Sequence, residues 1–341
     1  MRFFVTGGAG YIGSHIVLLL LDLGHDVVVL DNLSNGHRQA VPAAATFILG
    51  DVSDVSLIDD VLSDGPWDAI MHFAAKSIVA ESMIEPFSYL QQNFSDSLSL
   101  IDLAVRHKVP AFIFSSTAAL FDNKDGSIIT EDYPIMPCSP YGESKFMTER
   151  ALYWAERVHG LRSACLRYFN AAGADPKGRA GEDHRPETHL IPLAIEVALG
   201  KRPYLELFGN DYDTPDGSCI RDYVHVTDLA QAHLAALGTI GQESMVYNIG
   251  NGKGYSNLEV VQSVERVSGR RLDWRWAPRR EGDPAILVAS SDLLRKKTGW
   301  KSEFHDLDTI VETAFDWFEK HPNGYDSFPF HNPHSRSFAL S

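Results

Sequence analysis

A tyrosine and a lysine four residues apart, Tyr141 and Lys145, form a pair that could move a proton. At this spacing both side chains lie on one face of a helix. A phenol with a pKa of about 10 is a poor base at neutral pH, and a neighbouring ammonium group favours the phenolate. The same spacing also arises by chance, where a solvated lysine follows a half-buried tyrosine.

A run of hydroxyl groups favours the catalytic interpretation of this pair. The apolar run 111–114 leads into Ser115, Ser116 and Thr117, so hydroxyls stand at the carboxyl end of an expected strand. In an open parallel sheet this end faces the crevice in which ligands bind. Thr117 is therefore expected to hydrogen-bond the substrate oxygen from which Tyr141 takes a proton.

A glycine-rich turn near the start of the sequence predicts a phosphate-binding site. Gly7, Gly10 and Gly13 follow the short run Arg2–Thr6 and precede the apolar stretch Ile16–Leu23. Glycines at this spacing permit a tight turn, let backbone N–H groups approach a pyrophosphate and let helix and strand pack closely. Taken alone, the three glycines are also compatible with an ordinary strand-to-helix turn.

Two carboxylates extend this turn into a dinucleotide site. Asp31 ends the second apolar run, where a carboxylate accepts hydrogen bonds from an adenosine ribose. Asp51, followed by Val52, ends the third run, where an acid can meet the adenine amine. Asp31 would repel a 2′-phosphate, so NAD is predicted rather than NADP, although His37 and Arg38 nearby weaken that preference.

The elements that position these groups alternate along the first half of the chain. Strands are expected at 2–6, 25–31, 46–50, 67–73, 111–114 and 163–168, and helices at 87–106 and 141–158. Near-continuous apolar strands are typical of a sheet covered on both faces. The predicted fold class is α/β: a Rossmann-type doubly wound parallel sheet with a smaller C-terminal mixed α/β substrate-binding domain.

Past residue 170 the pattern changes to long loops rich in glycine, proline and charge. The run 244–249 is short enough to be a strand that returns to the sheet, and the apolar stripe of 307–318 predicts an amphipathic helix. The domains are expected to be 1–170, with 224–254 returning to it, and then 171–223 together with 255–330. Residues 331–341 are expected to form a loose tail.

Composition excludes several classes of partner. The 45 Asp and Glu against 30 Lys and Arg give a net charge of −15, which disfavours nucleic acid and an anionic membrane. The longest apolar run, 16–21, is far short of the about 20 residues that span a bilayer. With no secretory signal and no CxxC pair among its three cysteines, the chain is expected to be cytoplasmic. His184 and His189 lie in a loop without two further ligands at suitable spacing, so no metal site is expected.

These motifs resemble those of the extended short-chain dehydrogenase/reductases and, within them, of the UDP-galactose 4-epimerase family, over about residues 1 to 321. The general matches are TGGAGYIGSH, DN at 31–32, GD at 50–51, HFAA, ES at 81–82, Asn93, FIFSST, SPYGESK and RYFNAAG. The more specific matches are GEDHRPETHLIP, FGNDYDTPDGSCIRDYVHV, YNIGNG and APRREGD. The resemblance implies tightly bound NAD, a UDP-sugar substrate held by the second domain, and a homodimer formed through the helices at 87–106 and 141–158.

The resemblance also implies site residues, with Tyr141, Lys145 and Thr117 catalytic. NAD would be held by Gly7, Gly10, Tyr11, Ile12, Gly13, Asp31, Asn32, Leu33, Ser34, Asn35, Gly36, Asp51, Val52, Phe73, Ala74, Ala75, Lys76, Ser77, Asn93, Thr117, Tyr141, Lys145 and Phe169. The nucleotide sugar would meet Thr117, Tyr141, Asn170, His189, Leu190, Phe208, Arg221, Arg280, Asp283 and Leu287.

Two arginines of the second half agree with a nucleotide diphosphate as ligand. Arg221 and Arg280 could clamp its phosphates with forked donors. Alternatively, they are surface arginines that balance their neighbours Asp222 and Glu281. Asp283 could accept hydrogen bonds from the uridine ribose.

The residues after Thr117 bear on the reaction. Related dehydratases carry an Asp-Glu pair there and decarboxylases a glutamate, whereas this chain has Ala118-Ala119. Elimination thus has no evident catalyst, and return of the hydride to the opposite face of a 4-keto sugar is expected. UDP-pentose or UDP-uronate epimerisation, a dehydrogenase that releases NADH and a non-catalytic NAD sensor stay open as alternatives.

Three departures from the family pattern bear on the sugar. Phe121-Asp122 replaces the familiar Tyr-Gly pair, and His189 stands where asparagine is frequent. Leu287 stands where some members have a bulky tyrosine, which suggests room for a 2-acetamido group.

Overall fold

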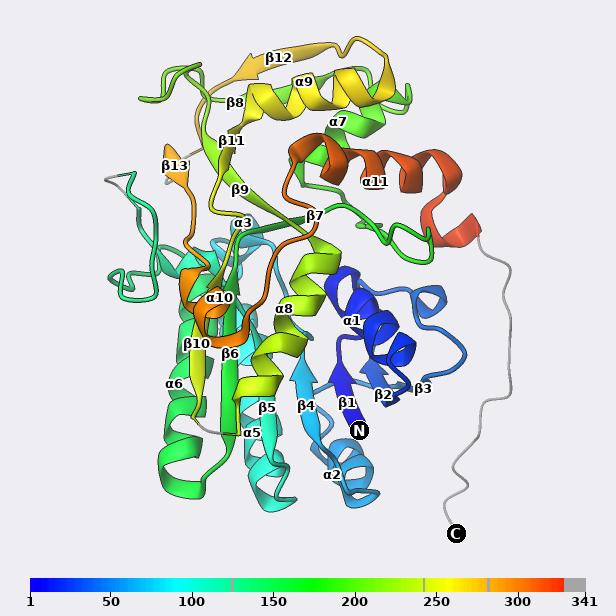
Figure 1. Cartoon of the computed structure of the whole chain (residues 1–341), viewed down its shortest axis with the longest axis vertical. Helices are drawn as coiled ribbons and strands as arrows, with labels where there is room; N and C mark the ends of the chain where they lie inside the picture. Colours follow the sequence, from blue (N-terminus) through cyan, green and yellow to red (C-terminus); the bar gives the residue numbers. More distant parts are fainter. Residues whose placement is uncertain (124–125, 242, 281–282, 328–341) are drawn as a thin grey trace.

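A seven-stranded parallel sheet organises the larger part of the protein (Figure 1). The computed structural model describes residues 1–123, 126–241, 243–280 and 283–327. The strands are, in spatial order, β10 (Met245–Ile249), β6 (Arg162–Tyr168), β5 (Ala111–Thr117), β4 (Ala69–His72), β1 (Arg2–Thr6), β2 (Asp26–Asp31) and β3 (Thr46–Leu49). Every neighbouring pair is parallel, which confirms the predicted fold class.

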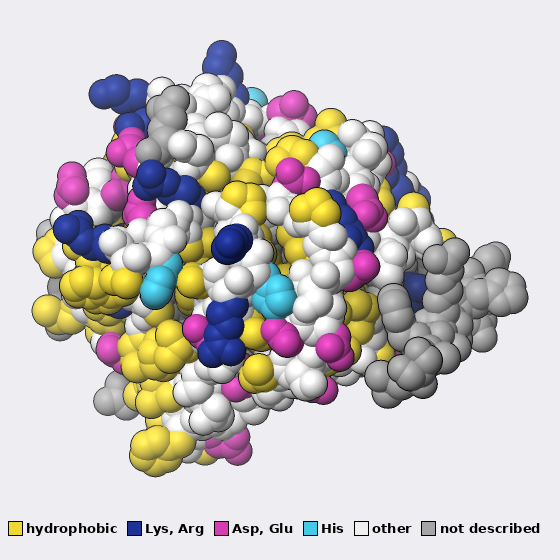
Figure 2. Space-filling model, turned by 90° about the horizontal axis from the view of Figure 1, so that it is seen from below, with side chains coloured by type: hydrophobic (Ala, Val, Ile, Leu, Met, Phe, Trp, Pro, Cys, Tyr) yellow, Lys and Arg dark blue, Asp and Glu magenta, His cyan; other side chains and the backbone are white. Residues whose placement is uncertain are grey.

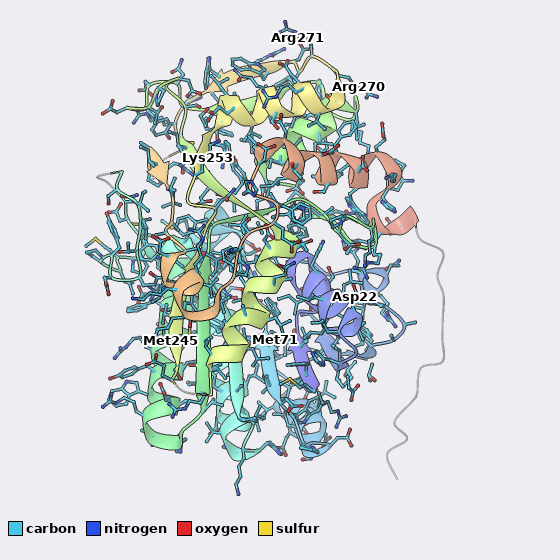
Figure 3. All side chains as sticks on the ribbon, in the orientation of Figure 1. Asp22, Met71, Met245, Lys253, Arg270 and Arg271 are labelled. Carbon is cyan, nitrogen blue, oxygen red and sulfur yellow. The ribbon has the colours of Figure 1, made fainter. Side chains whose placement is uncertain are left out.

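Helices cover both faces of this sheet, so successive strand residues enter different cores. Phe3 and Val5 lie in one apolar core and Phe4 lies in the other. Met71 of β4, labelled in Figure 3, lies in the same core as Phe3. The first core is covered by α1 (Tyr11–Asp22) and α8 (Val226–Thr239), and the second by α2 (Val55–Ser63), α5 (Asp96–Arg106) and α6 (Pro140–His159). Burial on both faces is the reason that these strands read as continuous apolar runs.

A smaller mixed unit lies above the sheet in Figure 1. Its strands are β7 (Asn170–Ala172), β9 (Ile220–His225), β11 (Gly254–Ser256) and β13 (Ile286–Leu287), with β8 (Leu205–Phe208) pairing β12 (Trp274–Ala277) separately. Its helices α7 (Leu190–Ala198), α9 (Asn257–Ser268) and α11 (Leu307–Lys320) enclose a third apolar core. Arg270 and Arg271 follow α9 at the far end of this unit (Figure 3).

Short elements complete the described chain: α3 (Val79–Ser82), α4 (Pro86–Tyr89), α10 (Asp292–Thr298) and 3₁₀ turns at Arg38–Ala40, Ala118–Leu120 and Gly324–Ser327. The expected helix at 87–106 is interrupted, because a π-helical turn, Leu90–Ser95, separates α4 from α5. Such turns are frequent at functional sites. Here the turn carries Asn93, whose side chain reaches the loop after β4.

The long loop after β7 is fastened to the larger sheet. Arg179 forms ion pairs with Asp175 in its own loop and with Asp22 at the end of α1, which Figure 3 labels. The expected strand at 244–249 is β10, paired with β6. The domain boundaries themselves stay a prediction, and the tail 331–341 lies outside the described residues. In the described ranges, every helix is too short or too polar to span a membrane.

Candidate active site

The site is built where the strand order reverses, between β1 and β4. In an open parallel sheet, ligands bind at the carboxyl ends of the strands at such a point. The N–H groups of Phe73 and Ala74 both donate to the carbonyl of Thr6, so the two loops leave the sheet side by side. Gly7 has a φ of +73°, and a Cβ on it would lie 2.4 Å from the Ala74 nitrogen. A side chain at this position would clash with the backbone of the loop after β4.

The glycine turn fits a pyrophosphate. A Cβ on Gly13 would lie 2.2 Å from the carbonyl oxygen of Gly7, so the helix approaches the strand as closely as backbone allows. Gly10 caps α1 without a side-chain hydrogen bond, and a Cβ there would meet only the Gly7 oxygen, at 3.4 Å. The first N–H groups of α1 are therefore open to an anion.

The acids at the ends of β2 and β3 form a polar edge beside this turn. Asp31 accepts hydrogen bonds from the N–H groups of Ala9 at 2.9 Å and Leu33 at 2.8 Å, which ties the ribose-side loop to the glycine turn. Burial raises the pKa of Asp31 despite these bonds. Asp51 accepts from the Asn32 amide at 2.6 Å. Burial opposes its charge, but hydrogen bonds from Ser53 and Asn32 lower the pKa of Asp51.

The remaining expected cofactor residues lie in loops at the same edge. Tyr11 donates a hydrogen bond to the Gly173 carbonyl at 2.6 Å. Asn93 receives the Lys76 N–H at 2.8 Å and donates to Ser144, which neighbours Lys145 on α6. The expected residues that are placed here by position alone are Ile12, Ser34, Asn35, Gly36, Val52, Ala75 and Ser77.

Helix α6 begins just before Tyr141, the tyrosine expected to be catalytic. Ser139 caps it by accepting the Gly142 N–H at 3.1 Å, and Pro140 occupies its first turn. The ammonium of Lys145 lies 6.0 Å from the Tyr141 ring centre and donates to the Ser115 carbonyl at 3.0 Å. The structure thus brings Tyr141 and Lys145 to the end of β5, as the sequence predicts.

Burial sets the charges of this pair. It raises the pKa of Tyr141, and a hydrogen bond with Thr117 lowers it only in part. Burial also lowers the pKa of Lys145 to about 7. The protein alone therefore holds the phenol protonated, and bringing it into working range requires a further positive charge, such as an oxidised nicotinamide ring.

A buried ion pair beneath the site was missed by the sequence reasoning. Glu149 binds Arg167 through two hydrogen bonds of 2.9 and 2.6 Å and also accepts the Ser116 hydroxyl at 2.6 Å. It thereby fixes the residue before Thr117. Its position four residues after Lys145, on the same helical face, is the signal that could have identified it.

The expected substrate residues of the second half meet across β9. Arg221 forms an ion pair with Asp283 at 2.5 Å, and Arg280 lies 4.0 Å from the centre of the Phe208 ring. Asp222 is not the counter-ion of Arg221, because it is buried and accepts backbone N–H groups of residues 251, 252 and 289. Glu281 lies outside the described residues.

An apolar cluster extends from the residues that follow β5 to β13. Leu287 packs with Ala118, Phe121 and Phe169, so the Phe of the unusual Phe-Asp pair is a packing residue. Leu287 is also the register partner of Arg221. Asn170 donates its amide to the Asp222 carbonyl at 3.0 Å, and Leu190 is the first residue of α7.

Comparison with known proteins identifies the family. The NAD dependent epimerase/dehydratase family matches residues 3–250. The chain belongs to this family. A UDP-glucose 4-epimerase of Halalkalibacterium halodurans is 46% identical over 329 residues, covering 96% of this chain and 98% of that relative. A solved UDP-glucose 4-epimerase structure has a TM-score of 0.93 at 47% identity, covering 95% of this chain and 99% of that one. The Brucella ovis UDP-glucose 4-epimerase in complex with NAD has a TM-score of 0.90 at 42% identity, covering 93% and 98%.

Membership of this family confirms the expected resemblance and NAD as the cofactor. The glycine turn, with its open helix N-terminus and its bordering carboxylates, suits this dinucleotide. The individual contacts expected for NAD and for the sugar stay predictions.

The sequence reasoning overlooked two further potential ligands beside His184 and His189, and the expectation that no metal binds here stays a prediction. The side chains of Glu182 and Glu187 meet His184 and His189, with all four ligand atoms within 4.8 Å of one another. Burial opposes their charges, but the imidazoles lower the pKa of Glu182, and the carboxylates raise the pKa of His189. The missing ligands were in the same loop.

Proposed function

We propose that this protein interconverts UDP-glucose and UDP-galactose by NAD-dependent epimerisation at C4. One observation carries the proposal: Tyr141, Lys145 and Thr117 converge at the end of β5, beside a dinucleotide turn and next to two alanines. These groups can remove and return a proton, but Ala118 and Ala119 offer no group that eliminates water.

Each catalytic residue has a distinct task. Tyr141 accepts the proton of the sugar 4-hydroxyl and returns it, while Thr117 hydrogen-bonds the same oxygen. Lys145, held at the Ser115 carbonyl, binds the nicotinamide ribose and favours the phenolate. NAD, when bound, supplies the hydride acceptor. Because the hydride would return to the sugar in each turnover, no NADH would leave, and the residues named for the dinucleotide would hold it throughout.

The arginines hold the nucleotide. Arg221 lies on β9 and Arg280 in the loop after β12, and both carry planar donors that suit phosphate oxygens. The Asp283 carboxylate, which pairs with Arg221, would accept ribose hydroxyls. In a chain with a net charge of −15, such local positive charge is required for a diphosphate to bind.

The sugar pocket also suits 2-acetamido sugars. Leu287 packs beside Ala118, Phe121 and Phe169 at the end of β5, so it borders the space in which the sugar must turn over. A leucine here is shorter than a tyrosine and leaves room at C2. UDP-pentoses and UDP-uronates remain the alternative substrates, and a dehydrogenase that releases NADH remains the alternative reaction.

A second copy of the chain is the proposed partner. Large apolar side chains are exposed on α4, α5 and α6 and just before them, including Ile84, Phe87, Leu98, Trp154 and Val158. Phe87 alone is 82% exposed. Figure 2 shows that apolar side chains gather along one side of the face seen from below. A face of this kind is typical of a protein interface, and a homodimer would cover it. The cytoplasmic location stays a prediction from the sequence.

Proton NMR of the purified protein with UDP-galactose and no added cofactor tests the proposal. Appearance of UDP-glucose, with the same final ratio from either sugar, is expected. Steady accumulation of NADH after NAD is added would instead indicate a dehydrogenase. If UDP-hexoses do not react even with added NAD, the hexose assignment is wrong, and UDP-pentoses and UDP-uronates are tested next.

A further inference from the structure

Four potential metal ligands converge in the loop that precedes α7. They are Glu182, His184, Glu187 and His189, and each offers one ligand atom to the cluster. Two imidazoles and two carboxylates form a donor set typical of first-row divalent cations, zinc in particular. Of these four residues, only His189 also belongs to the expected nucleotide-sugar residues.

The distances between the donor atoms are close to those of a tetrahedral site. The Nδ1 of His184 lies 3.0 Å from Glu182 and 3.8 Å from Glu187. The Nδ1 of His189 lies 2.5 Å from Glu182 and 3.4 Å from Glu187. Ligands at about 2.0 to 2.1 Å from a tetrahedral zinc ion are separated by about 3.3 Å. The two Glu187 distances are to different oxygens of its carboxylate, and all four ligand atoms lie within 4.8 Å of one another. Each pair would therefore have to change its separation by no more than about 1.5 Å to admit an ion.

The cluster contains a polar atom without a hydrogen bond. The Nδ1 of His184 is buried and, despite its short distance to Glu182, is not oriented for a hydrogen bond. Behind it, the carboxylates of Glu182 and Glu187 are only 4% and 7% exposed. Burying two carboxylates is costly unless cations pair with them. A divalent ion would coordinate the carboxylates of Glu182 and Glu187 and also the Nδ1 of His184.

The surrounding structure fixes these ligands. The Glu187 carboxylate accepts the backbone N–H groups of residues 188 and 189 at 2.7 and 2.8 Å. The carbonyl of Glu182 accepts the indole N–H of Trp317 on α11 at 3.0 Å. Such outer contacts orient ligands before a metal binds. His184 and Glu187 also line a surface pocket of about 540 Å³, which provides an entry path.

We propose that these four side chains bind one divalent cation of the zinc type, which cross-links the loop 182–189 just before α7 begins. His184 packs edge-on against Tyr11 at 6.1 Å between ring centres, so the cluster borders the start of α1 and the expected NAD site. Four protein ligands leave no open position, which is the arrangement of a structural zinc site. The role is therefore to hold the loop rather than to activate a substrate.

The test uses the NAD-containing protein without a polyhistidine tag. After dialysis against EDTA, it is titrated with ZnCl₂ against a chromophoric zinc indicator. We expect one tight equivalent per chain in the wild type and a loss of affinity of at least about 100-fold in His184→Gln and Glu187→Gln. His107→Gln is the matched control, because His107 pairs with Asp59 at another surface and should leave the tight equivalent unchanged.

Two further readouts keep the test independent of zinc that binds elsewhere. Co²⁺ should give the strong visible absorption of a four-coordinate site in the wild type and in His107→Gln but not in Glu187→Gln. Zinc should also raise the Tm of the wild type and of His107→Gln but not that of Glu187→Gln, because a ligand stabilises the state that binds it. No tight equivalent in the wild type, or one that survives both cluster substitutions, would overturn the proposal. UDP-galactose turnover in the same samples reports separately on the proposed function.

Discussion

The catalytic and substrate regions of this protein are held in place by different means. Along the larger sheet, two of the expected site residues bind backbone groups: Lys145 donates to the Ser115 carbonyl, and Asp31 at the end of β2 accepts two backbone N–H groups. In the substrate region, side chains position one another, as in the ion pair of Arg221 with Asp283. Lys145 is 3% exposed, whereas the side chains of Arg221 and Asp283 are 12% and 27% exposed.

Because of this difference, substitutions should be tolerated less well in the first region than in the second. Groups fixed to a buried parallel sheet cannot shift without disturbing both cores, so the reaction type is tied to the fold. A side chain in the substrate region can be exchanged singly, and the sugar specificity can then change while the chemistry stays the same.

Replacing Tyr141 should have the largest effect. Tyr141→Phe removes the only proposed proton acceptor, and kcat is expected to fall by about 10³, within the usual range for general acid–base groups. The bound NAD should stay, because the glycine turn and Asp31 are untouched. Turnover of UDP-galactose and nucleotide released on denaturation measure the two effects.

Thr117→Ala is the graded comparison for this substitution. It removes a hydrogen bond to the same oxygen and leaves the proton acceptor, so a smaller loss is expected, of about 10 to 100-fold. Near-normal turnover in Tyr141→Phe, or loss of NAD from it, would contradict the separation between catalytic and substrate regions.

Replacing Arg221 should weaken binding more than chemistry. Arg221→Ala removes charge-assisted hydrogen bonds to the diphosphate and leaves Asp283 unpaired, so KM for UDP-galactose should rise by about 10 to 100-fold. The matched control is Arg279→Ala, which breaks a similar pair with Asp211 at the surface and should change KM little. An equal fall in kcat with unchanged KM would place Arg221 in the chemistry instead.

Local sequence patterns predicted the catalytic region well. The strands at 2–6 and 111–114 are apolar on both faces, and Gly7 and Gly13 lie where a Cβ would clash with nearby backbone. The strands and the glycine turn could therefore both be anticipated from the sequence. The Arg221–Asp283 pair could not, because 62 residues separate the partners. The four potential metal ligands lie within eight residues of the sequence, but their spacing is not that of one face of a helix or strand. Whether their side chains meet therefore depends on how one loop folds.

Acid should destabilise the region of the larger sheet through its buried histidines. Burial lowers the pKa of His233 to about 4, below its usual value of about 6.5. The unfolded chain therefore binds a proton first as the pH falls, and stability is lost between about pH 6.5 and 4, by about 1.4 kcal/mol per pH unit. In the substrate region the effect of acid on stability has the opposite sign. Burial raises the pKa of Asp222 to about 7, so the folded chain binds a proton first there and gains stability as the pH falls.

His233→Leu isolates this contribution. Among the described residues, the Nε2 of His233 has no hydrogen-bond partner, and the ring packs against Phe73. The folded protein should therefore tolerate a leucine at this position at pH 7. Urea unfolding at pH 7 and pH 5 should show that the variant loses about 2 kcal/mol less than the wild type between these values. Equal losses would mean that His233 is not the group that takes up the proton.

Replacing Leu287 should have the smallest effect and bear on specificity alone. Leu287→Tyr adds bulk beside Ala118 and Phe169, so turnover of UDP-N-acetylglucosamine should fall about tenfold relative to UDP-glucose. Leu287→Met keeps the volume and should leave the ratio near its wild-type value. The ratio is measured with both sugars at saturating concentration. An unchanged ratio in Leu287→Tyr would remove Leu287 from the sugar pocket, whereas a fall for both sugars together would mean that this strand positions the catalytic groups as well.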